Sequence, residues 1–183
     1  MKNIIFYSII FTALCVYGCD DDDNTNPDPM LLPYQEIGIV TGLDLLDANG
    51  QPLGRWRVPN HKNGVISVFP IPNNGVFSMI GNQTIKEIWL VPASCAVDST
   101  TMNIDELAQN LTFSVSEVAA IAVKNVDTSG SGNQITVDFS DVSNGFYKVF
   151  FDLTTDGLRW QNIYIDDNFS GMPNFETLDN ACN

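Results

Sequence analysis

Few residues in this sequence have the types and spacing that catalysis requires. The adjacent carboxylate pairs Asp105-Glu106 and Asp166-Asp167 carry groups that serve acid–base chemistry. Because neighbouring side chains point to opposite sides of a strand or into solvent, we do not expect either pair to act on one bond. The single histidine, His61, lies in a segment of loop composition, where we expect an exposed residue. With no hydrolase, zinc-protease or nucleotide-binding motif, the sequence predicts a protein that is not an enzyme.

Calcium is the metal that the acid-rich turns would suit best, because it binds several oxygen ligands. The turn Asp166-Asp167-Asn168 offers such oxygens. The chain nevertheless lacks the Asp-x-Asp-x-Asp-Gly calcium loop, and Asp47-Ala48-Asn49-Gly50 is too short to supply one. We therefore expect solvated turns, no metal and no cofactor.

The charge balance argues against a nucleic-acid partner. Asp and Glu number 22 against 8 Lys and Arg, so the formal net charge is −14 at pH 7. A chain this acidic repels phosphate backbones, and we expect no binding to DNA or RNA.

Tryptophans are the residues most suited to contact a partner or a sugar ring. Trp89 and Trp160 lie inside predicted strands, where core packing is expected. Trp56 is flanked by Arg55 and Arg57, and Arg and Trp often dominate protein interfaces, so these three residues form a candidate partner contact. In the alternative, Trp56 packs inward while both arginines neutralise nearby acids, as alternation along a strand would produce.

The N-terminus has the pattern of a secretory signal. A short positive segment, Met1-Lys2-Asn3, precedes the apolar run 4–16, which is too short to span a bilayer comfortably. The run ends in Val16-Tyr17-Gly18-Cys19, which resembles the bacterial lipobox. This resemblance implies removal of residues 1–18 and attachment of diacylglycerol to the thiol of Cys19. An ordinary signal peptide with incidental cysteines is the alternative.

Four aspartates follow this cysteine directly. The cluster Asp20, Asp21, Asp22 and Asp23 resembles the export signal of surface-exposed outer-membrane lipoproteins of the Bacteroidota. The resemblance is limited to the start of the chain, and it implies a lipid anchor in the outer membrane with the domain facing the cell exterior. In the alternative, the aspartates only keep a linker solvated.

Residues 19–33 are acidic and contain Pro27, Pro29 and Pro33, so they are predicted to form a tether. Residues 34–183 then form a single domain.

Two cysteines lie in this domain, Cys95 and Cys182, and an oxidising envelope favours a disulfide between them. Two free thiols are the alternative, because spacing in the sequence does not show proximity.

Turn signals recur along residues 34–183 and indicate an all-β domain. Asn-Gly and Asp-Gly pairs accept the positive φ values of tight hairpins, and such pairs recur in the segments 47–50, 72–75, 143–145 and 155–157. Between turns, apolar residues alternate, as at Ile135, Val137 and Phe139. Strands are expected near 36–43, 65–69, 76–80, 85–91, 135–139, 147–153 and 159–165. This pattern predicts an immunoglobulin-like or related two-sheet β-sandwich.

One short helix is expected to interrupt the strands. Asn103 can cap it, with Glu106 three residues on, and apolar residues with helical spacing follow up to Leu111. The segment 116–123 fits either a buried strand or a short helix, because periodicity does not distinguish the two.

Two functions are compatible with these features. We expect a non-enzymatic accessory subunit of an outer-membrane protein complex, for secretion, barrel assembly or nutrient uptake, because the chain is small and carries its own anchor. The alternative is a free-standing cell-surface binder of glycan or another extracellular ligand. An exposed aromatic platform would favour the binder, and an exposed apolar patch or strand edge would favour the subunit.

Overall fold

A computed structural model describes residues 37–96, 111–169 and 173–183 of the chain. Ten strands and two helices lie in these described ranges. The strands are β1 (Ile39–Val40), β2 (Leu43–Leu46), β3 (Pro52–Trp56), β4 (Ile66–Phe69), β5 (Val76–Gly81), β6 (Ile85–Cys95), β7 (Lys124–Asp127), β8 (Gln134–Asp138), β9 (Gly145–Leu153) and β10 (Gly157–Ile165). The helices are α2 (Val115–Ile121) and α3 (Phe175–Cys182).

The largest sheet has five strands and is buried on both faces. Its order is β1-β6-β9-β10, and β7 pairs with β6 beside β1. Ile88 and Leu90 of β6 point into the main core, whereas Trp89 and Val91 point into a second, smaller core on the opposite face. Apolar residues therefore run almost without interruption along β6 and β9, as expected for strands covered on both sides.

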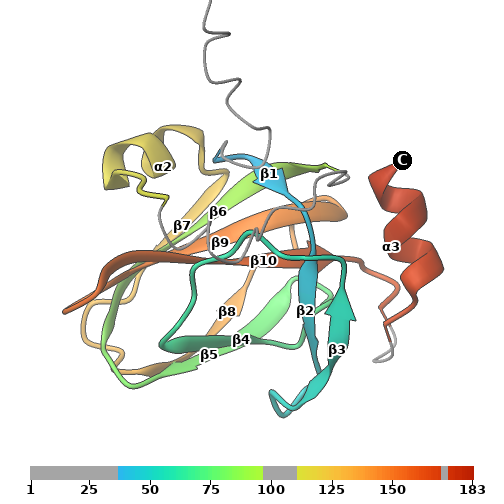
Figure 1. Cartoon of the computed structure of the whole chain (residues 1–183). Coiled ribbons are helices and arrows are strands. Elements are labelled where there is room, and N and C mark those ends of the chain that lie inside the picture. Colours follow the sequence, from blue (N-terminus) through green and yellow to red (C-terminus); the bar gives the residue numbers. More distant parts are fainter. Residues whose placement is uncertain (1–36, 97–110, 170–172) are drawn as a thin grey trace, which may run out of the picture. The chain divides into compact units, whose positions relative to one another are not determined.

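Two smaller sheets cover the face of the main core. One is the β2–β3 hairpin, and the other has the order β4-β5-β8. In Figure 1 these strands lie below β6, β9 and β10, and the main core takes side chains from all three sheets. The predicted all-β, sandwich-like fold is confirmed, with three sheets where two were expected.

A glycine allows the first strand region to bend. The sequence predicted one strand over 36–43, but β1 and β2 are separate, with Thr41 and Gly42 between them. A Cβ on Gly42 would lie 2.7 Å from the backbone oxygen of Trp56, so only glycine permits this close approach of the two backbones. The break moves the chain from the five-stranded sheet into the β2–β3 hairpin.

Helix α2 covers the second core. Ser114 and Glu117 form a capping box, and Val118 is buried against the five-stranded sheet. The ambiguous segment 116–123 is therefore mostly helical. The helix predicted from Asn103 falls outside the described residues except for Leu111.

The C-terminal helix α3 is covalently joined to the sheet. A disulfide links Cys95, at the end of β6, to Cys182, with a Cα–Cα distance of 5.1 Å and a sequence separation of 87. Leu178 of the same helix is buried in the main core. The predicted pairing of the two cysteines is present in the structure, and it fixes the C-terminus against the end of the sheet.

Candidate functional site

Trp56, the central residue of the candidate partner contact at residues 55–57, is buried. Trp56 is only 3% exposed, and its ring stacks on Phe146 with ring centroids 5.5 Å apart. Its Nε1 donates a hydrogen bond to Asp179 Oδ1 at 3.1 Å. The indole therefore belongs to the core between β3, β9 and α3.

Both arginines around this tryptophan are paired with acids. The Arg57 guanidinium lies over the Trp56 ring, 4.4 Å from its centroid, and bonds to Asp179 at 2.9 Å. Arg55 Nε pairs with Asp44 Oδ1 at 2.8 Å. An exposed indole at Trp56 is contradicted, because the ring packs on Phe146 and bonds to Asp179 of α3, whereas Arg55 is exposed. The alternative arrangement, an inward tryptophan with neutralised acids, is the one observed.

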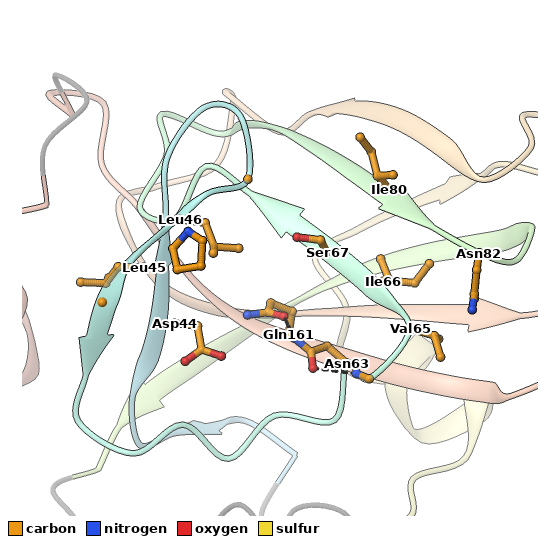
Figure 2. Close-up of a pocket in the computed structure, with 14 residues that line it drawn as sticks. Asp44, Leu45, Leu46, Asn63, Val65, Ile66, Ser67, Ile80, Asn82 and Gln161 are labelled. Atoms are coloured by element: carbon orange, nitrogen blue, oxygen red, sulfur yellow. Dashed lines mark hydrogen bonds between the residues drawn. The ribbon is translucent and has the colours of Figure 1, made fainter.

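One hollow among the described residues is a cleft of about 680 Å³. It lies between the β2–β3 hairpin and strands β4 and β5, and Gln161 of β10 forms part of its floor. Figure 2 shows the side chains of Asp44, Gln161 and Asn63 converging in its lower part. We refer to this hollow as the hairpin cleft.

Asp44 is the charged group of the hairpin cleft. Burial would raise the pKa of its carboxyl, but hydrogen bonds and charges from His61 and Arg55 outweigh burial and lower the pKa to about 2. His61 Nε2 lies 3.1 Å from Asp44 Oδ2, and His61 is buried. The expectation of an exposed His61 was wrong, because its imidazole packs against Asp44 of β2.

Gln161 supplies a buried amide to the same cleft. Asn63 Oδ1 accepts a hydrogen bond from the Gly64 amide at 2.6 Å, which leaves Asn63 Nδ2 to donate to Gln161 Oε1. The amide orientation of Gln161 follows, because Oε1 must face Asn63. Its Nε2 is fully buried and has no hydrogen-bond partner. Such an amide leaves two buried donors without an acceptor in the protein.

The upper walls of the hairpin cleft are largely aliphatic. Leu46, Ile66 and Ile80 line them, and Ser67 adds one hydroxyl. Figure 2 shows Ile66 and Ser67 on β4, with Ile80 on the neighbouring strand β5. Ile80 is 39% exposed, so it stands at the mouth of the cleft. The cleft thus combines a polar floor with apolar walls, as small-molecule sites commonly do.

A second feature is an exposed apolar surface at α2. Val115, Ile121 and Val123 are each more than two-fifths exposed. Ile121 borders an open hollow of about 530 Å³, which is also lined by Ile37, Phe113, Glu117 and Ala120. Val115 and Val123 line a separate hollow of about 260 Å³ on the other side of the helix. We call these residues together the α2 surface. The sequence analysis did not find it, because the helical character of this segment was undecided.

Lys148 of β9 is fully buried, although two-residue alternation would place it on the face of the strand opposite Tyr147 and Val149. Its Nζ lies 5.8 Å from the centroid of the Phe113 ring and 5.9 Å from that of Trp160. Burial lowers the pKa of its ammonium group to about 7. The face of β9 that carries Lys148 is covered by α2 and its flanking residues, which the sequence pattern did not reveal.

The acid-rich segments do not gather metal ligands in the described ranges. Asp166 Oδ1 accepts a hydrogen bond from the Asn168 amide at 2.9 Å, which makes 166–168 a local turn. In the described parts of the chain, no three His, Cys, Asp or Glu side chains are close enough to hold one ion. The pair Asp105-Glu106 lies outside the described residues, as do Cys19 and Asp20–Asp23.

Comparisons with protein-family models, with curated proteins and with solved structures found no match to this chain. In the described segments, neither helix has the length and apolar character needed to cross a membrane.

Proposed function

We propose that this chain is a non-enzymatic, lipid-anchored accessory subunit of an outer-membrane protein complex. The anchor is the lipobox cysteine Cys19, and the acidic cluster Asp20–Asp23 would direct the protein to the cell exterior. The observation that carries the subunit role is the α2 surface. Exposed apolar side chains gathered on one short helix are typical of surfaces that another protein covers.

The position of the α2 surface agrees with an anchored subunit. Ile37, the first described residue after the proposed tether, lines the hollow beside α2. A tether that runs from Cys19 would therefore join the domain at Ile37, beside the hollow that Ile121 of α2 borders. This arrangement favours a partner embedded in the outer membrane, with an apolar region that packs against α2.

The charges around α2 agree with an apolar contact. Glu117 is the acidic residue of its first turn, its last turn has no basic residue, and Lys124 pairs with Asp141. Partner residues that meet Val115 and Ile121 would bury apolar area, while the Glu117 carboxylate keeps its hydrogen bonds from the Ser114 amide and hydroxyl. Each fully buried side chain of this size contributes about 1.5–3 kcal/mol.

Membrane co-purification of variants tests this role. Val115→Glu combined with Ile121→Glu changes two exposed side chains, so the domain should still fold while the contact is lost. The control is Leu53→Glu, at an exposed apolar residue on β3. We expect tagged wild type and control to retain the same outer-membrane protein after solubilisation, and the double variant to lose it.

The subunit proposal fails if the double variant retains that protein, or if no protein co-purifies with wild type in a larger amount than from an untagged strain.

The alternative function is a free-standing surface binder of glycan or another ligand. The three tryptophans do not provide the exposed aromatic platform that such a binder would use, because Trp56, Trp89 and Trp160 are all buried. The feature that favours it is the hairpin cleft.

A further inference from the structure

We propose that the hairpin cleft binds a neutral, polyhydroxylated ligand, such as a short carbohydrate, with Gln161 and Asp44 as its polar contacts. This inference concerns a surface other than α2 and does not depend on the subunit role. It begins from Gln161, whose Nε2 is buried and unpartnered while its Oε1 is held by Asn63.

An unpaired buried amide costs free energy unless something accepts its hydrogen bonds. The cost is about 1–3 kcal/mol for one buried donor. Gln161 lines the hairpin cleft, so a ligand oxygen that reached its buried Nε2 at the cleft floor would accept a hydrogen bond from it. The first requirement on the ligand is therefore an acceptor oxygen near the cleft floor.

Asp44 sets a second requirement, which is that the ligand also carries a hydrogen-bond donor. Its carboxylate stays ionised because His61 and Arg55 lower its pKa to about 2, although burial would raise the pKa. Each carboxylate oxygen has two lone pairs, so Asp44 accepts further hydrogen bonds beyond those from Arg55 and His61. A hydroxyl both accepts and donates, so neighbouring hydroxyls on one ligand satisfy Gln161 and Asp44 together.

Charge and shape narrow the ligand class further. The negative charge of the chain and of Asp44 repels anions, while Arg55 already occupies the position that a cationic ligand would take beside Asp44. The aliphatic walls at Leu46, Ile66 and Ile80 match the C–H faces of a sugar ring. A volume of about 680 Å³ lies in the range of small-molecule sites.

The test uses the full-length protein, solubilised in detergent, on an array of short neutral oligosaccharides. The tightest-binding sugar is then titrated by calorimetry against wild type and variants. Gln161→Glu keeps an oxygen that accepts the hydrogen bond from Asn63, and it removes the unpartnered Nε2 donor. The affinity for the sugar should therefore fall at least tenfold. Asn125→Asp, the same amide-to-acid change on the exposed strand β7, is its control and should bind like wild type.

Ile80→Trp provides a second variant that does not alter a buried residue. The larger side chain fills the mouth of the hairpin cleft and should abolish sugar binding. Val76→Trp lies on the same strand β5, is exposed and does not line the cleft, so its affinity should be unchanged. Thermal melting of each variant verifies that it is folded.

Three results would overturn the proposal. The first is no binding of any neutral oligosaccharide at millimolar concentration. The second is a bound sugar whose affinity is the same in wild type, Gln161→Glu and Ile80→Trp. The third is the binding of a peptide, identified on a parallel peptide array, in the hairpin cleft. In that case Ile80→Trp would block peptide binding, and neutral sugars would not compete with the peptide.

Discussion

A buried lysine in β9 makes the stability of this domain depend on pH. Lys148 has a pKa of about 7 in the folded chain, lowered by burial, against 10.5 as its ordinary value. The unfolded chain therefore holds one more proton than the folded chain between these two values. The free energy of unfolding should rise with pH across this window, by up to about 1.4 kcal/mol per pH unit, and lose this dependence below pH 7.

Urea unfolding of wild type and Lys148→Met at pH 7, 8 and 9 tests this linkage. The variant should lack the added slope, because methionine has a similar shape and does not titrate. Lys86→Met, at an exposed lysine that pairs with Asp152, should keep the wild-type slope. Equal slopes for wild type and Lys148→Met would contradict a lowered pKa at this residue.

Trp56 has a structural role that a single substitution measures. Its ring packs on Phe146 and its Nε1 bonds to Asp179, so Trp56→Ala leaves a cavity and removes one of the two hydrogen bonds to Asp179 Oδ1, the other coming from Arg57. We expect the free energy of unfolding to fall by about 3–5 kcal/mol. Leu53→Ala, at an exposed residue of the same strand, should change it little. A loss below about 1 kcal/mol for Trp56→Ala would show that the indole does not belong to the core.

At the scale of elements, α3 depends on its covalent link to β6. The Cys95–Cys182 disulfide closes a long loop, and such a bond stabilises the folded chain by roughly 4–5 kcal/mol in the chain-entropy model. Reduction should therefore lower the melting temperature by at least several degrees. A Cys95→Ala, Cys182→Ala double variant should melt lower and show no response to reductant. Labelling of both thiols in native, unreduced protein would contradict the bond.

At the scale of the whole molecule, the proposed anchor decides where the domain lies. Cys19→Ser removes the thiol that would carry the lipid, so the variant should accumulate as uncleaved precursor or soluble protein. Leu53→Ala, at an exposed residue outside the N-terminal segment, should fractionate with membranes like wild type. Normal membrane fractionation of Cys19→Ser would reject the lipoprotein proposal.

The direction that the domain faces is a separate prediction. Replacing Asp20–Asp23 with alanines should keep the lipid anchor but leave the protein facing the periplasm. Protease added to whole cells should then cleave wild type and spare the variant. A variant that is cleaved as readily as wild type would show that these aspartates only solvate the linker.

Local chemistry in the sequence predicted much of the strand pattern. Asn-Gly and Asp-Gly turns and two-residue alternation predicted β4, β5, β8 and β10 close to their observed bounds. Two strands were missed, β3 with the sequence Pro-Leu-Gly-Arg-Trp and β7 with Lys-Asn-Val-Asp, because neither contains an apolar alternation. Helix α3 was missed as well.

The position of each functional side chain was decided by tertiary structure. The sequence by itself determined the acidic charge, the anchor motif and the all-β class, because composition, short motifs and turn chemistry are local properties. It did not determine that Trp56 packs inward or that Lys148 is buried, since both depend on which elements cover a strand. The hairpin cleft joins Asp44, Asn63 and Gln161 from three distant segments. Only the pairing and stacking of sheets brings such residues together, because contacts at this sequence separation leave no periodic signal along the chain.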